Sequence, residues 1–114
     1  MGQCLFCEII AGNVPCDEVF SDDEILAFRD INPQAPLHAL IIPKEQIRTI
    51  NDIESTHADL IGKLFLAAAE IAREEGVAEE GYRVVMNCNQ AGGQAVYHIH
   101  LHILGGRQMG WPPG

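Results

Sequence analysis

Positive charge is scarce in this sequence. Seven lysines and arginines stand against 16 aspartates and glutamates, which gives the 114 residues a formal net charge of −9. A protein that binds duplex nucleic acid needs a basic stripe to neutralise phosphates, and this chain has none. We therefore expect no nucleic-acid polymer among its partners. A single nucleotide carries few charges, so an acidic protein can still bind it through backbone N–H groups or imidazoles.

Long hydrophobic runs are also missing. The most apolar helical stretch, 60–72, contains Gly62, Lys63 and Glu70, whereas a membrane-spanning helix needs roughly 18 unbroken apolar residues. Residues 1–7 lack the basic and apolar regions of a signal peptide. These features predict a cytoplasmic protein with no membrane partner. The four cysteines, at positions 4, 7, 16 and 88, are then expected to be reduced.

The pattern of apolar residues predicts a single α+β domain over residues 1–114. Spacings of three and four between 55 and 75 are typical of an amphipathic helix, and a short helix is expected over 4–11. Short segments bounded by turn residues predict five strands, at 18–20, 25–28, 37–42, 82–87 and 96–104. Residues 89–93 are expected to form a loop. Short sequential strands with one long helix are typical of an antiparallel sheet with its helices on one face.

Three of the five histidines alternate with aliphatic residues in one short segment, Tyr97-His98-Ile99-His100-Leu101-His102-Ile103. Side chains on a strand point alternately to opposite faces, so the three imidazoles share one face and lie about 6.6 Å apart. The aliphatic row can then pack in the core while the imidazole row lines a cleft.

Two chemistries fit this row of imidazoles. A His-x-His pair can chelate Zn²⁺, but the first and third imidazoles are about 13 Å apart, and no carboxylate follows Asn87 to serve as another ligand. The alternative is nucleophilic catalysis, because an imidazole that is neutral at pH 7 can attack phosphorus. The flanking imidazoles would orient the attacking ring, bind phosphate oxygens and carry a proton. Gly92 and Gly93, before the row, can bring backbone N–H groups close to an anion.

The segment from His98 to Leu104 matches the His-φ-His-φ-His-φ-φ signature of the histidine triad superfamily, which the chain resembles over nearly its whole length. The resemblance also rests on residues 28–36, His38, residues 41–44, residues 92–94 and residues 104–109. The terminal Trp111-Pro112-Pro113-Gly114 is similar to the histidine triad nucleotide-binding branch, and less so to the dinucleotide-polyphosphate hydrolase and uridylyltransferase branches.

The resemblance implies a fold and an activity. The fold is an antiparallel five-stranded sheet with one long helix and a short N-terminal helix, and the sheet continues across a homodimer. The activity is hydrolysis of purine nucleoside phosphoramidates and of aminoacyl-adenylates such as lysyl-AMP to the purine nucleoside monophosphate, through a nucleotidyl-histidine intermediate. The C-terminal tail, 105–114, contributes to the partner's active site. Two alternatives stay open: a nucleotide-binding or scaffold protein with little or no turnover, and a dinucleotide polyphosphate hydrolase.

The same resemblance assigns roles to particular residues. His100 attacks phosphorus, His38 and His98 form a relay behind it, and His102 contacts the phosphate. The nucleotide-binding residues are Asp30 at the ribose hydroxyls, Phe28 and Ile31 at the base, and Asn87, Gln94, His100 and His102 at the phosphate.

Two positions depart from the family pattern. Relatives that bind zinc use a Cys-x-x-Cys pair, the first triad histidine and a histidine after the Pro-Lys. Here Cys4 and Cys7 fit, but Gln46 takes the last position, and an amide is a poor zinc ligand. We therefore expect that no cofactor is required and that zinc is not held at Cys4 and Cys7. Ala95 is the second departure, because relatives usually carry Ser or Thr there, near the leaving group.

Overall fold

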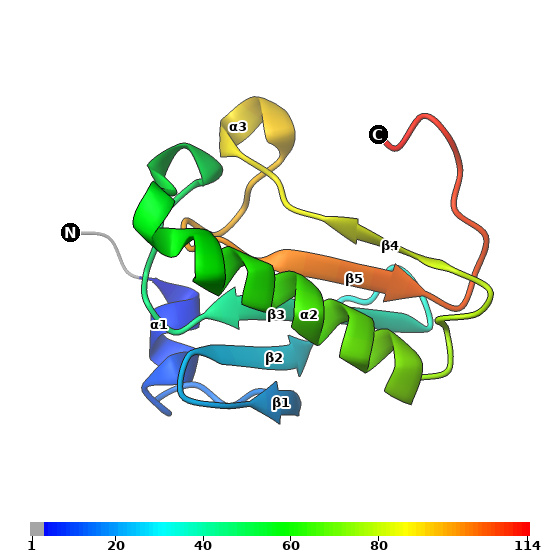
Figure 1. Cartoon of the computed structure of the whole chain (residues 1–114), viewed down its shortest axis with the longest axis horizontal. Helices are drawn as coiled ribbons and strands as arrows, with labels where there is room; N and C mark the ends of the chain where they lie inside the picture. The colour runs from blue at the N-terminus through cyan, green and yellow to red at the C-terminus, as the bar shows by residue number, and fades with distance from the viewer. Residues whose placement is uncertain (1–3) are drawn as a thin grey trace.

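The computed structural model describes residues 4–114, so residues 1–3 of the predicted domain lie outside the described part (Figure 1). Five strands form one antiparallel sheet in the order β1-β2-β3-β5-β4. Their bounds are β1 Glu18–Ser21, β2 Ile25–Arg29, β3 Leu37–Pro43, β4 Tyr82–Val85 and β5 Leu101–Gly105. The helices are α1 Leu5–Ile10, α2 Ala58–Glu74 and α3 Asn89–Gly92, with 3₁₀ turns at Ile50–Asp52 and Ser55–His57. The predicted fold class is confirmed.

The two predicted helices pack on opposite faces of the sheet. Alternate residues of β2 and β3, such as Ile25 and Ile41, pack against α2, which crosses the sheet in Figure 1. The residues between them, such as Phe28 and Leu40, pack against Phe6 of α1. The expectation that the helices share one face is therefore wrong. Both faces of β2 and β3 are apolar, and the second face needs a cover of its own.

The fifth strand starts later than predicted, at Leu101 rather than at residue 96. In the antiparallel register Ile41 pairs with Leu101, so a longer ladder would next pair Ile42 with His100 and then Pro43 with Ile99. Pro43 has no N–H to donate, its carbonyl accepts from His98 Nε2 at 2.7 Å, and the Ile99 N–H donates to the carbonyl of Ile47 at 2.8 Å. The ladder therefore ends at Leu101, and His98 and His100 lie on irregular chain just before it.

The segment from β4 to α3 also differs from the prediction. β4 ends at Val85, two residues early, and the expected loop 89–93 contains the one-turn helix α3. Gly93 ends α3 with a φ of 83°, a conformation that costs glycine little. Across residues 4–114, none of the helices is both long enough and apolar enough to cross a membrane.

Candidate functional site

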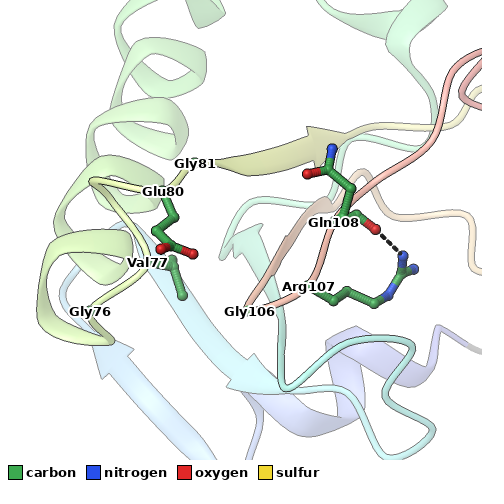
Figure 2. Close-up of a pocket in the computed structure, with 7 residues that line it drawn as sticks. All are labelled: Gly76, Val77, Glu80, Gly81, Gly106, Arg107 and Gln108. Atoms are coloured by element: carbon green, nitrogen blue, oxygen red, sulfur yellow. Dashed lines mark hydrogen bonds between the residues drawn. The ribbon is translucent and has the colours of Figure 1, made fainter.

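A mostly apolar cavity of about 390 Å³ opens beside the histidines on the α1 face of the sheet. Its apolar walls include Phe6, Phe28, Leu40 and Val96, and its polar lining includes Asp30, Asn87, His100 and His102. A second cavity, of about 430 Å³, lies between residues 76–81 and 106–108 and is polar (Figure 2). We place the candidate site in the first cavity, because apolar walls with a few converging polar groups are the usual form of a small-molecule site.

His100 is a buried imidazole whose proton is held on one nitrogen. Its Nδ1 lies 2.8 Å from the backbone carbonyl oxygen of His98, and a carbonyl only accepts hydrogen bonds. Nδ1 therefore carries the proton and Nε2 keeps the lone pair. Burial lowers the pKa of His100, which favours the neutral ring at pH 7. His100 can thus act as a nucleophile through Nε2.

His38 and His102 form a hydrogen-bonded pair between β3 and β5. His38 Nδ1 accepts from the backbone N–H of Gln34 at 3.0 Å, so the proton of neutral His38 is on Nε2. That Nε2 lies 2.9 Å from His102 Nδ1 and 3.4 Å from Asp30 Oδ2. His102 accepts at Nδ1 and keeps its own proton on Nε2. Burial, with smaller effects of His100 and His38, lowers the pKa of His102 to about 4, so His102 is a neutral N–H donor at the cavity.

These contacts differ from the predicted relay, in which His38 and His98 stand together behind His100. His38 bonds His102, and His98 supplies only its backbone carbonyl to His100. We therefore correct the relay to two separate arrangements, a carbonyl that orients His100 and a histidine that orients His102. The late start of β5 causes the difference, because His98 lies before the strand and its ring turns to Pro43.

The ring of His98 belongs to a group with Cys4 and Cys7. Its Nε2 donates to the Pro43 carbonyl, so Nδ1 has the lone pair, and Nδ1 lies 3.4 Å from Cys4 Sγ and 3.6 Å from Cys7 Sγ. The three ligand atoms lie within 4.8 Å of one another. Two thiols and an imidazole whose other nitrogen is hydrogen-bonded fit a zinc ion. Zinc bound there would tie α1 to the His98 segment, a structural role. Gln46 instead donates to the carbonyl of Tyr97 at 3.3 Å.

Six of the seven predicted nucleotide contacts line the cavity: Phe28, Asp30, Ile31, Asn87, His100 and His102. Phe28 is buried, while Ile31 is fully exposed and stands at the rim. Asp30 follows β2 directly, and its Oδ1 accepts from the backbone N–H of Asn32 at 2.8 Å, which orients the carboxylate. The structure thus brings an apolar wall and a carboxylate together near His100 and His102.

Gln94 does not line this cavity, although the sequence analysis groups it with the phosphate contacts. It is buried, and its Oε1 accepts from the Asn89 N–H at 2.8 Å. Both protons of its Nε2 are also used, by the carbonyls of Arg48 at 2.7 Å and Val96 at 3.1 Å. With all of these groups engaged, the amide of Gln94 braces the chain between α3 and the histidines and has no donor left for a phosphate.

The residues that α1 contributes to the cavity are absent from the predicted site. Phe6 is buried, its ring centroid lies 4.9 Å from that of His100 at an interplanar angle of 85°, and Leu5 and Ile9 also line the cavity. The apolar spacing of residues 5, 6, 9 and 10 was the available signal, since a short helix with such a face needs a surface to cover.

The fold and the site define a small α+β protein in which histidines on and before one strand face a ligand cavity. The chain belongs to the HIT domain family, whose model matches residues 11–109.

Individual relatives match almost the whole chain. The chain is 52% identical over 108 residues to the purine nucleoside phosphoramidase of Escherichia coli strain K12, covering 95% of this chain and 91% of the relative. It is 50% identical over 112 residues to a 14 kDa zinc-binding protein of Zea mays, and the match covers 96% of this chain and 87% of the relative. A crystal structure of a HIT family hydrolase from Legionella pneumophila Philadelphia 1 superposes with a TM-score of 0.97 and 57% identity, covering 98% and 100%.

Proposed function

We propose that this protein is a hydrolase that cleaves the P–N bond of purine nucleoside phosphoramidates and releases the nucleoside monophosphate. The observation that carries the proposal is the state of His100: its Nδ1 proton is held by the His98 carbonyl, which leaves Nε2 unprotonated in a ring that lines the cavity. The HIT domain match and the 52% identity to a purine nucleoside phosphoramidase support the same reaction.

The proposed reaction has two steps. His100 Nε2 attacks phosphorus, the P–N bond breaks, and the amine leaves with a proton taken from the solvent, which gives a nucleotidyl-histidine. Water then attacks phosphorus and returns a proton to the solvent, and the bond to Nε2 breaks, which restores the neutral imidazole. The Nε2–H of His102 donates to a phosphate oxygen as negative charge develops on it. Groups that are already oriented in a water-poor site stabilise such charge without reorganisation.

The cavity supports the choice of a purine nucleotide. Phe28 and Ile31 form apolar walls for the base, and the Asp30 carboxylate accepts from the ribose hydroxyls. Asn87 and His102 contact the phosphate, next to the attacking His100. We extend the proposal to aminoacyl-adenylates such as lysyl-AMP, because the same attack on phosphorus displaces a carboxylate. None of these steps uses a metal, so a chelator should affect the rate only by removing zinc from Cys4, Cys7 and His98 and loosening α1.

We also propose that two copies pair along β4. β4 is an edge strand, and α2 exposes the side chains of Phe65 by 49% and of Leu66 by 71%. An edge strand and exposed apolar side chains each favour association, and antiparallel pairing of two β4 strands would continue the sheet. The tail runs past β4 (Figure 1), and Trp111 is 83% exposed in a single chain. Pairing would bring the tail, 105–114, to the partner's site.

A turnover panel tests the proposal, with adenosine and guanosine phosphoramidates, lysyl-AMP and diadenosine polyphosphates as substrates. The wild-type protein should turn over the phosphoramidates, whereas His100→Ala should bind AMP and lose turnover. A slow substrate should label the wild-type protein at His100. AMP binding without turnover by the wild-type protein would favour a binding protein instead. Preferential cleavage of diadenosine polyphosphates would favour the dinucleotide hydrolase alternative.

A further inference from the structure

The loop between β2 and β3 is shaped by polar contacts rather than by packing. Its residues 31–34 are exposed, and Pro33 and Pro36 have no N–H. Gln34 makes three hydrogen bonds in this loop. Its backbone N–H donates to His38 Nδ1 at 3.0 Å, its carbonyl accepts from Arg107 Nε at 2.8 Å, and its side-chain amide donates to the Asn32 carbonyl at 3.0 Å. One residue thus connects the C-terminal segment with the histidine pair.

We propose that Arg107 is a positioning residue for His38 and His102, acting through Gln34. The Arg107 guanidinium holds Gln34 where its N–H meets the lone pair of His38 Nδ1. That N–H keeps the His38 proton on Nε2, which donates to His102 Nδ1 and leaves the His102 proton on Nε2, at the cavity. The effect on turnover rests on the proposed function, whereas the placement of the protons does not.

The start of the tail is pressed against the same loop. Gly106 has a φ of 92°, and a Cβ at that position would lie 2.9 Å from Cβ of Pro36. This close approach places Arg107, the next residue, beside Gln34. In Figure 2, Arg107 lies on the wall of the polar cavity with its guanidinium away from Glu80. Its Nη1 donates to the Gln108 carbonyl at 3.1 Å, so two of its nitrogens are bound to carbonyls and the side chain is held in one direction.

Arg83 offers a matched control. Its Nη2 donates to the carbonyl of Gly110 at 2.7 Å, so it also anchors the tail through an arginine–carbonyl bond. This bond lies three residues further along the tail than Arg107 and does not involve Gln34. A role in anchoring the tail would be shared by both arginines, whereas a role in placing the histidine protons would belong to Arg107 alone.

The experiment compares Arg107→Met, Arg107→Lys and Arg83→Met with the wild-type protein. Ring ¹⁵N chemical shifts of His38 and His102 report which nitrogen of each ring is protonated, and adenosine phosphoramidate reports kcat and KM. In the wild-type protein both rings should carry the proton on Nε2. Arg107→Met should give a mixture of tautomers and lower kcat about five- to tenfold with little change in KM, the size expected for one lost hydrogen bond. Arg107→Lys keeps a hydrogen-bond donor and should restore most of the wild-type tautomer population and most of kcat. Arg83→Met should leave the tautomers unchanged.

Wild-type tautomers in a folded Arg107→Met protein would overturn the proposal, and so would an equal change in Arg83→Met. Thermal unfolding checks that each variant is folded; if Arg107→Met is not, Arg107→Gln replaces it in the same comparison. If none of the proteins hydrolyses the substrate, the proposed function fails, and the ¹⁵N shifts still decide whether Arg107 places the protons.

Discussion

At the scale of single residues, hydrogen bonds to the backbone decide which ring nitrogen of each histidine carries the proton. The carbonyl of His98 leaves His100 with a lone pair on Nε2, whereas the N–H of Gln34, acting through His38, leaves His102 with a proton on Nε2. An imidazole with a lone pair on Nε2 and an imidazole with a proton on Nε2 thus lie two residues apart, with ring centroids separated by 5.0 Å. Burial keeps both rings neutral, because a low-dielectric surrounding disfavours the charged form.

The half-buried His102 makes the free energy of unfolding depend on pH. The pKa of His102 is about 4 in the folded protein, against 6.5 for a histidine in the unfolded chain. Between these two pH values the unfolded chain binds a proton that the folded protein does not. The stability that this group contributes is therefore fully present above pH 6.5 and is lost as the pH falls toward about 4, by at most about 3 kcal/mol because the ring is partly exposed and solvent screens its charge. Urea unfolding between pH 4 and pH 8 should show a shallower dependence for His102→Asn than for the wild-type protein. The same slope in both proteins would contradict the assignment.

Ala95 lines the cavity with His100 and offers no hydrogen-bond donor to a leaving group. A hydroxyl there could hydrogen-bond the departing amine, and one such bond made in the transition state is worth about 1–3 kcal/mol. Ala95→Ser should therefore speed phosphoramidate hydrolysis several-fold and barely change lysyl-AMP hydrolysis, because a carboxylate leaves without a proton. Rates are compared where chemistry limits turnover, with the isosteric pair Ala95→Thr and Ala95→Val as control. An equal gain on both substrates would contradict the role.

At the scale of elements, the site depends on α1, which covers the face of the sheet opposite α2. Phe6 contributes most of this cover, with its ring edge-on to Phe28, His98 and His100 at centroid distances of 5.5, 6.0 and 4.9 Å. Cys4 caps the N-terminus of the helix, because its Sγ accepts from the backbone N–H of Cys7 at 3.1 Å. A six-residue helix is marginal alone, so packing against the sheet stabilises it.

Removing the Phe6 side chain should lower the free energy of unfolding. Phe6 is 4% exposed, and Phe6→Ala is expected to lower the free energy of unfolding by about 3 kcal/mol, in the range for a buried aromatic residue. Leu5 is the neighbouring control on the same helix, because it is 49% exposed, and Leu5→Ala should cost less than about 0.5 kcal/mol. Denaturant unfolding of both variants measures the difference. Similar losses would show that α1 does not pack on the sheet through Phe6.

At the scale of the whole molecule, the C-terminal tail extends away from the domain that carries it. Arg107 and Arg83 bind it at two points, and beyond them Trp111 is 83% exposed in the single chain. A large aromatic side chain gains free energy when it is buried, and the proposed pairing along β4 would provide a surface for it. The site of one copy would then be completed by its partner.

Truncation after Met109 tests this arrangement. It should change the preference among apolar and polar leaving groups by about tenfold, the value of a partly buried aromatic contact, and should change AMP affinity less. The measurements are kcat/KM across a series of phosphoramidates and AMP binding by titration. Trp111→Ala should reproduce most of the effect. An equal loss with every leaving group would indicate general destabilisation and contradict a contact with the leaving group.

The sequence alone determined the features that depend on local periodicity. The three- and four-residue spacing of Leu64, Ala68, Ile71 and Ala72 predicted α2, and all four are buried. The alternation around His102 predicted that Ile99, Leu101 and Ile103 face the core, as they do. Burial of alternate or periodic residues follows from the geometry of one element, so a single segment of sequence contains the information.

Only the tertiary structure decided which atoms of the site meet. The partners are distant in sequence: Gln94 bonds Arg48, His98 bonds Pro43, and His38 bonds His102. Pro43 ends the β5 ladder at a point that the β propensity of residues 96–100 does not reveal, and the two apolar faces of β2 and β3 place α1 opposite α2. A hydrogen-bond acceptor sets a tautomer only when it lies within about 3 Å, and the packing of whole elements brings it there.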